Sequence, residues 1–212
     1  SDFGVPIVKV LQKMSPAVDD VESAKPGDFY VATSGQLWDG TEGLKVIPSY
    51  YRKVFTIWTP RDLDGGYQGE LAPDDPIVKE ATQQGAKKVL ENGDELVETV
   101  NWYLSVVNDD SMPMRVLFPM SSTQLRVSRK FISLSSGIKL KDVDGNLYTP
   151  AMFSHVYKMT TQQETNAKGS WFSLSLSLAG PVGDAITYEN AKELYGIAKS
   201  ISGPSLPQTE VN

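Results

Sequence analysis

Alternation of hydrophobic and polar residues runs through much of the chain. The clearest case lies in residues 171–179, where every second residue is large and apolar and the residues between them are serines. A period of two is typical of a β-strand with one buried face. The alternating apolar residues are Phe172, Leu174, Leu176 and Leu178. Residues 153–161 precede this segment, and we expect the two to form a hairpin across residues 165–170.

Turn residues separate the other predicted strands. Asn92-Gly93 stands between residues 88–91 and 95–107, and this dipeptide is the strongest short-range signal for a hairpin. Thr33-Ser34-Gly35 predicts a second tight hairpin. The remaining predicted strands are residues 5–11, 29–32, 36–39, 44–47, 50–58 and 114–118.

The segment 50–58 carries large side chains on both of its faces. Because side chains alternate along a strand, one set of positions faces one side and the other set faces the opposite side. The first set is Tyr51, Lys53, Phe55 and Ile57, and the second is Arg52, Val54, Thr56 and Trp58. We expect either a central strand or a strand that binds a ligand.

Three segments have helical signals. Asp75 before Pro76 predicts a helix start, and the helix is expected to end near Gln84. Ser122 is expected to cap a helix through Leu134, and Thr187 is expected to cap a last one. Since turns rather than helices join most strands, the pattern predicts a β-rich α+β fold with an antiparallel sheet or small barrel and about three helices.

The charge is unevenly distributed. The chain has a net charge of −6, yet residues 111–141 contain six bases and no acid, whereas residues 1–110 contain 10 bases and 19 acids. This segment predicts a positive stripe that attracts a polyanion. The alternative is that its bases neutralise acids from the first half. The six bases are Arg115, Arg126, Arg129, Lys130, Lys139 and Lys141.

Signals for catalysis are weak. The chain has no Cys, which excludes disulfides, thiolate nucleophiles and Cys-ligated metals, and its one His, His155, excludes a two-His metal site. Asp142 and Asp144 resemble the start of a calcium loop, but the later ligand positions are absent and a hairpin turn is expected. We predict no enzyme, no metal and no cofactor. No signal peptide and no membrane span are visible, so we expect a soluble, cytoplasmic protein.

Aromatic and basic residues are interleaved in residues 50–61. Grooves for single-stranded nucleic acid combine aromatic faces, on which bases stack, with cations that follow the phosphates. Trp102-Tyr103 and Trp171-Phe172 are candidates to extend such a platform. The alternative is that these aromatic residues belong to the core, which is their commoner place in strands.

Several short motifs resemble tailed-bacteriophage proteins of the replication and recombination type. The motifs are Tyr51-Arg52-x3-Thr56-x-Trp58-x-Pro60-Arg61-x3-Gly65-Gly66, Val127-Ser128-x-Lys130, Gly169-Ser170-Trp171-Phe172 and Tyr188-x2-Ala191-Lys192. The chain is similar in character to phage single-stranded-DNA-binding proteins with an OB-fold core. The resemblance implies one OB-like domain with insertions, which we place over residues 1–201. Residues 202–212 contain two prolines and no apolar periodicity, so we expect a flexible tail there. The tail holds one acid and lacks the acidic, phenylalanine-tipped end with which such proteins recruit partners.

These observations together predict a non-catalytic protein that coats single-stranded DNA in the host cytoplasm, with replication or recombination proteins as further partners. Self-association is left open. The expected phosphate contacts are Arg52, Lys53, Arg61, Arg115, Arg126, Arg129 and Lys130, and the expected stacking residues are Tyr51, Phe55, Trp58 and Trp102. The alternatives are a virion or assembly protein that acts through protein contacts, and a metal-dependent nuclease that uses clustered Asp residues.

Overall fold

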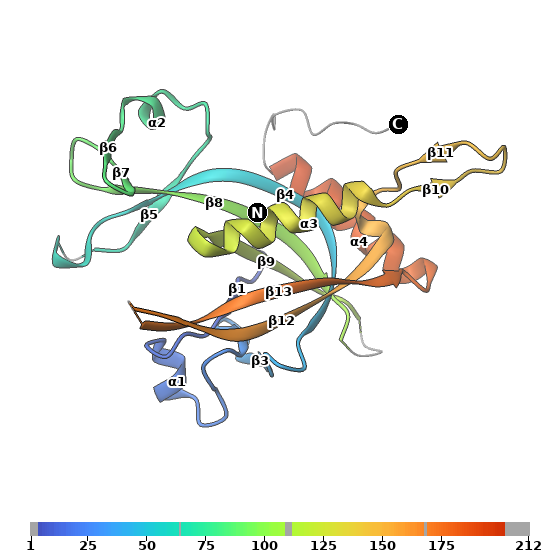
Figure 1. Ribbon diagram of the computed structural model, residues 1–212, viewed down its shortest axis with the longest axis horizontal. Coiled ribbons are helices and arrows are strands. Elements are labelled where there is room, and N and C mark those ends of the chain that lie inside the picture. Colours follow the sequence, from blue (N-terminus) through green and yellow to red (C-terminus); the bar gives the residue numbers. More distant parts are fainter. Residues whose placement is uncertain (1–3, 64, 109–111, 168, 202–212) are drawn as a thin grey trace.

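An eight-stranded antiparallel sheet dominates the computed structural model, which describes residues 4–63, 65–108, 112–167 and 169–201 (Figure 1). The spatial order is β13-β12-β4-β8-β7-β6, with β5 added beside β4 and β9 beside β8. The strands are β4 (Leu44–Trp58), β5 (Tyr67–Leu71), β6 (Thr82–Gln84), β7 (Lys87–Val89), β8 (Glu95–Val106), β9 (Met114–Ser121), β12 (His155–Asn166) and β13 (Gly169–Pro181).

The long strands β4 and β8 have different neighbours at their two ends, so this sheet has two parts. The first residues of β4 pair with β12, whereas its last residues, from Phe55, pair with β5. The first residues of β8 pair with β7, and the rest of it, from Thr99, pairs with β9. The strands β13, β12, β4, β8 and β9 therefore form a body. The far ends of β4 and β8, together with β5, β6, β7 and the short helix α2 (Pro76–Glu80), form a projection that we call the arm (Figure 1).

The remaining elements cover the body or extend from it. A small antiparallel sheet joins β1, β2 and β3, and a separate hairpin joins β10 and β11. These elements are β1 (Val8–Val10), α1 (Pro16–Asp20), β2 (Phe29–Val31), β3 (Gln36–Trp38), η1 (Arg61–Leu63), η2 (Ser122–Gln124), α3 (Leu125–Gly137), β10 (Leu140–Lys141), β11 (Leu147–Tyr148), η3 (Met152–Ser154) and α4 (Ala185–Ile201).

The main core lies between the body and a layer made of α3 and the small sheet, and we call this side of the body its inner face. Trp102 of β8 is fully buried there and stacks on Phe131 of α3, with ring centroids 4.3 Å apart. The indole Nε1–H of Trp102 donates a hydrogen bond to Ser128 Oγ at 2.9 Å, so its one polar group is satisfied. Tyr157 of β12 contacts Phe131 edge-on, and burial raises the pKa of Tyr157 to about 12.

Helix α4 covers the opposite, outer face of the body. Its buried residues Leu194 and Ala198 pack against Tyr50 and Tyr103, from neighbouring strands of the sheet. Ala191 packs in the same way against Ile47. The body thus lies between α4 on its outer face and α3 with the small sheet on its inner face, which explains why its central strands are apolar on both faces.

The β-rich α+β class with an antiparallel sheet is confirmed, but the described strands do not close into a barrel. In the spatial order of the body, β9 and β13 stand at opposite ends and do not pair with each other. The N-terminal segment lies beside β9 instead, through a parallel bridge between Ile7 and Leu117. The predicted tail, residues 202–212, lies outside the described residues.

Most predicted elements are present, with corrected bounds. The two predicted strands 44–47 and 50–58 are one strand, because β4 passes Pro48 through a bulge. Helix α2 ends at Glu80, since Thr82–Gln84 turns back through Gly85 to pair with β7.

The predicted helix caps need correction as well. Ser122 has a φ of 50° and precedes α3 by a 3-10 turn, so it does not cap that helix. The last helix begins before Thr187, and the side chain of Asp184 accepts the Thr187 amide hydrogen at 2.8 Å. Asp184 therefore stabilises the beginning of α4.

Replacing Phe131 by Ala should lower the free energy of unfolding by about 3–5 kcal/mol, because it opens a cavity beside Trp102 and Tyr157. Urea denaturation measures this loss. Ser133→Ala, at an exposed position of the same helix, is the control and should change the free energy by less than about 0.5 kcal/mol. A Phe131→Ala protein as stable as the control would contradict the assignment of this stack to the core.

His155 should make the protein less stable in mild acid. It is buried, and burial lowers its pKa below the ordinary 6.5, so the unfolded chain takes up a proton at a pH where the folded chain does not. The part of the stability that depends on neutral His155 is therefore complete above pH 6.5 and is lost as the pH falls below that value. Urea unfolding at about pH 7.5 and about pH 5.5 should show a loss that His155→Gln reduces. An equal loss in the two proteins would assign the effect to other groups.

Candidate nucleic-acid interface

The predicted contact residues of β4 lie on two different faces of the sheet. Tyr51 contacts Trp102, so it and the residues two and four positions later point to the inner face. Arg52 and Trp58 point to the outer face, where Arg52 pairs with Glu70 of β5. The sequence-predicted set on this strand is therefore not one continuous surface.

The inner-face residues form a strip that leads from α3 onto the arm, and we call Tyr51, Lys53, Phe55 and Lys88 the inner strip. The ring of Tyr51 lies 4.8 Å from that of Trp102 and is half-buried, which raises its pKa. Lys53 is exposed, and Lys88 Nζ lies 5.2 Å from the centroid of the Phe55 ring. Successive positions on one face of the strand are about 7 Å apart. Glu98 of β8 pairs with Phe55 and is an exposed acid on the same face.

On the outer face of the arm, Trp58 is 43% exposed and forms an edge-to-face pair with Tyr67 at 5.6 Å. Its Nε1–H donates to Thr56 Oγ1 at 3.0 Å, which fixes the ring orientation. Arg52 is held by Glu70, which also accepts a hydrogen bond from Asn101 Nδ2. Arg61 begins η1, and its side chain lies outside the described part of the structure.

Trp102 needs a correction from a stacking residue to a core residue. It has no exposed surface, and both its ring face and its N–H are used by α3. A base cannot reach it in this structure. Sequence periodicity placed Trp102 on a strand but contained no sign of which face α3 would cover.

The bases of the predicted positive stripe are spread over β9, α3 and the hairpin β10–β11. Arg115 points to the outer face and contacts Glu193 of α4 at 2.5 Å. Arg126 lies 3.6 Å from Glu164 of β12. These two pairs agree with the alternative in which the bases neutralise acids, although both acids come from the last third of the chain.

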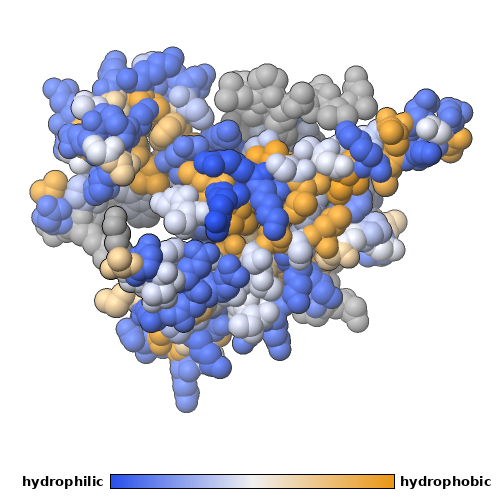
Figure 2. All heavy atoms as spheres, in the orientation of Figure 1, coloured by the Kyte–Doolittle hydropathy of each residue, from blue (hydrophilic) through white to orange (hydrophobic). Residues whose placement is uncertain are grey.

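Two further bases of α3 differ in their contacts. Lys130 Nζ donates to the Leu176 carbonyl oxygen at 2.7 Å. Arg129 is exposed and forms no ion pair with any residue that the structure describes. Strongly hydrophilic residues gather over α3 on the face shown in Figure 2. Of the predicted cations with described side chains, Lys53, Arg129 and Lys130 are thus the ones without a described carboxylate partner, and Lys130 is bonded to a backbone carbonyl instead.

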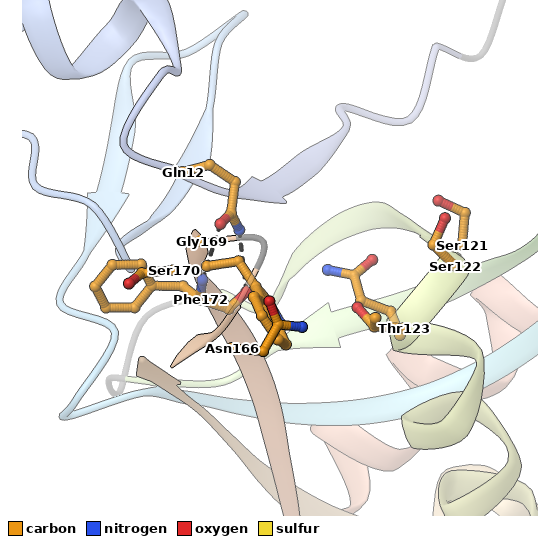
Figure 3. A pocket seen from close by; sticks show the side chains of 10 residues that line it. Gln12, Ser121, Ser122, Thr123, Asn166, Gly169, Ser170 and Phe172 are labelled. Atoms are coloured by element: carbon orange, nitrogen blue, oxygen red, sulfur yellow. Dashed lines mark hydrogen bonds between the residues drawn. The ribbon is translucent and has the colours of Figure 1, made fainter. Parts of the chain in front are cut away.

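A groove of about 610 Å³ lies where the body remains open, between η2 and the start of β13 (Figure 3). Hydroxyl and amide groups supply most of its polar surface, and two aromatic side chains supply the apolar part. The Nε1 atom of Trp171 is buried and has no hydrogen-bond partner among the described residues. The lining residues are Gln12, Ser121, Ser122, Thr123, Gln124, Asn166, Gly169, Ser170, Trp171 and Phe172.

Gln12 fixes one wall of this groove. Its side-chain amide donates to the Phe172 carbonyl oxygen at 3.0 Å and accepts the Phe172 amide hydrogen at 2.8 Å (Figure 3). These bonds attach the N-terminal segment to β13, 160 residues away along the chain. Sequence reasoning missed Gln12 and the segment Ser121–Gln124, because neither carries a charge or an aromatic ring.

Two of the aspartates in turn-like segments, Asp75 and Asp142, serve as cap and turn residues. Asp75 Oδ1 accepts the Ile77 amide hydrogen at 2.9 Å, and Asp142 accepts the amide hydrogens of Asp144 and Asn146. These hydrogen bonds lower the pKa of Asp142. Within the described ranges, no three His, Cys, Asp or Glu residues are grouped to hold a metal ion. Nor does any helix there have the length and apolar character to cross a membrane.

The chain matches the family model described as Pam3 phage gp34-like protein over residues 1–202. No curated protein and no solved structure matches it. The family match supports a phage origin for the chain, whereas its description contains no activity.

Gln12→Ala should loosen the groove wall. It removes two hydrogen bonds and leaves the Phe172 amide without its partner, so the free energy of unfolding should fall by about 1–2 kcal/mol. Hydrogen exchange at the Phe172 amide should become faster, while amides in the middle of β12 should keep their rates. Unchanged exchange at Phe172 would show that this bond does not protect the amide in solution.

Proposed function

The chain belongs to the Pam3 phage gp34-like protein family, and we propose that it is a non-catalytic protein that binds single-stranded DNA during phage replication or recombination. The observation that carries this proposal is the inner strip, in which Lys53 and Lys88 flank the partly exposed ring of Phe55 on the arm. Sites for single-stranded nucleic acid combine aromatic faces, on which bases stack, with cations that contact the phosphates.

The connectivity of the body supports the proposal. In chain order it consists of a three-stranded meander (β4, β8, β9), a helix (α3) and a hairpin (β12, β13) whose first strand returns to pair with β4. An OB-fold is a partly open five-stranded Greek-key barrel with the same sequence of elements. The open edge between β9 and β13 here contains the groove and the N-terminal segment.

The position of α4 changes where a strand can bind. OB-folds commonly bind oligonucleotides on the face of their second and third strands, beside the loops that follow the first and fourth strands. Here α4 packs on β8 at Tyr103 and holds Arg115 on β9. The corresponding loops are the arm and the turn between β12 and β13, which contributes Asn166 and Gly169 to the groove. We therefore assign the DNA path to the inner strip, the exposed side of α3 at Arg129, and the groove.

The charges favour modest, salt-sensitive binding. Lys53 and Arg129 are exposed and can contact phosphates, whereas Glu98 on the same face as Phe55 weakens the attraction there, and the net charge of −6 opposes a polyanion over the rest of the surface. Hydroxyl and amide groups in the groove can bond to sugars and base edges without strong sequence preference. A virion or assembly role is the second candidate, and the exposed apolar hairpin β10–β11 favours it.

Phe55→Ala should weaken binding of a short oligo-dT by about 1–3 kcal/mol, because it removes one stacked ring. Trp58→Ala is the matched control: the same strand loses an exposed ring from the opposite face, and the affinity should stay unchanged. Fluorescence anisotropy measures both affinities, and rising salt should weaken binding of the wild-type protein because counterions are released from the DNA.

Different outcomes separate the candidates. No binding by the folded wild-type protein at low salt would overturn the proposal and leave the assembly role. Loss of affinity in Trp58→Ala with none in Phe55→Ala would move the site to the outer face. Lys53→Glu should weaken binding as well, whereas Lys45→Glu, at an exposed position near the other end of β4, should have a smaller effect.

A further inference from the structure

The groove between η2 and the start of β13 has no charge of its own. None of the described residues that line it is acidic or basic, and their polar groups are hydroxyls and side-chain amides. The rings of Trp171 and Phe172 are partly exposed beside these groups. Neutral donors and acceptors next to aromatic rings suit an uncharged ligand with a flat ring, because a charged group needs a paired countercharge when it leaves water.

The polar side chains at the η2 side of the groove are not used to cap the backbone (Figure 3). Ser121 and Gln124 occupy the positions before η2 and before α3, where a side chain often caps the following turn, yet neither makes such a hydrogen bond. Ser122 has a φ of 50° and is the only residue other than glycine with a positive φ in the part of the chain that the structure describes. Strained residues of this kind cluster at sites that hold ligands.

The groove adjoins the inner strip across β8. Phe55 pairs with Glu98 of β8. The next residue of β8, Thr99, pairs with Ser121 at the end of β9. Adjacent strands lie about 4.8 Å apart, so the backbone of Ser121 lies about 10 Å from that of Phe55. Phosphates of one nucleic-acid strand are about 3.4 Å apart along a stacked helix, so about three nucleotides span this distance.

The charges at this crossing disfavour a phosphate. Glu98 is exposed on the face of Phe55, and its carboxylate repels an anion there. The exposed cations Lys53 and Arg129 lie on the inner strip and on α3 instead. Backbone N–H groups at the start of η2 and α3 attract an anion. Among the lining residues that the structure describes, however, no side-chain cation adds to that attraction.

We propose that the groove holds the nucleoside part of a bound strand, its base and sugar, and binds no phosphate. This inference rests on the proposed function, since it assigns one part of the same DNA site. Trp171 and Phe172 offer ring faces to a base, and the amide of Gln124 offers a donor and an acceptor to the edge of the base. Binding then has two parts: Lys53 and Arg129 supply a salt-sensitive part, and the groove supplies a part that salt hardly changes.

NMR titration with thymidine and with thymidine 5′-monophosphate tests the assignment without an oligonucleotide. Thymidine should shift the amide signals of residues 121–124 and 169–172, and the monophosphate should bind there no more tightly. Gln124→Ala should weaken thymidine binding by about two- to tenfold, because it removes a hydrogen-bonding group. Gln162→Ala is the matched control, since it removes an exposed amide of β12 that does not line the groove, and it should leave the affinity unchanged.

Tighter binding of the monophosphate at these signals would show that the groove takes a phosphate, and it would overturn the proposal. Absence of any shift up to the solubility limit of thymidine would overturn it as well. Circular dichroism confirms that each variant is folded.

Binding of oligo-dT over a salt series gives a second test. For single strands the logarithm of the affinity falls with the logarithm of the salt concentration by about 0.7 for each phosphate contacted. Arg129→Gln should therefore reduce the slope by about 0.7. Gln124→Ala should lower the affinity at every salt concentration and keep the wild-type slope, and a reduced slope in this variant would contradict a phosphate-free groove.

The two tests separate this inference from the proposed function. If oligo-dT binds but thymidine does not shift the groove signals, the DNA-binding function stands and the assignment of the groove fails. If oligo-dT does not bind at low salt while thymidine still binds the groove, the proposed function fails and the groove remains a site for free nucleosides.

Discussion

The contact of Trp102 with Phe131 and Tyr51 is the interaction on which the rest of the structure depends. It joins α3 to β8 and β4 through aromatic faces, and Tyr157 extends it to β12. The single polar group of Trp102 is satisfied by Ser128, so the cluster is buried without an unpaired donor. Because these rings lie at the centre of the main core, their packing fixes where α3 crosses the sheet.

The position of α3 then determines which parts of the surface are available. Tyr51 is half-covered at the edge of the helix, and the next inner-face residues of β4 emerge beyond it on the arm. On the other side of the sheet, α4 covers Tyr50 and Tyr103. The alternation of a strand thus separates two exposed surfaces of the arm: Lys53 and Phe55 on one face, and Trp58 with Tyr67 on the other. Because of this separation, a ligand on one of these surfaces does not cover the other.

Local patterns predicted much of the secondary structure. Asn92-Gly93 does turn the chain between β7 and β8, and the serine-alternating segment is β13. Elements failed to match where strand pairing overruled the local signal. Thr82–Gln84 continued a helical pattern but pairs with the adjacent strand β7, and Pro48 marked a strand end but lies at a bulge where β4 pairs with β8. Local propensity is weak compared with pairing and burial, so the local preference is lost.

By itself the sequence determined the fold class, the two faces of β4 and the scarcity of groups for catalysis, since periodicity and composition act locally or over the whole chain. Only the tertiary structure decided that Trp102 is buried, that Arg115 is paired with Glu193, 78 residues away, and that Gln12 bonds to β13. The tertiary structure likewise decided where the groove lies and which segments form the opposite ends of the molecule. The reason is that burial and ion pairing depend on which segments meet across the sheet, and residue spacing along the chain does not contain that information.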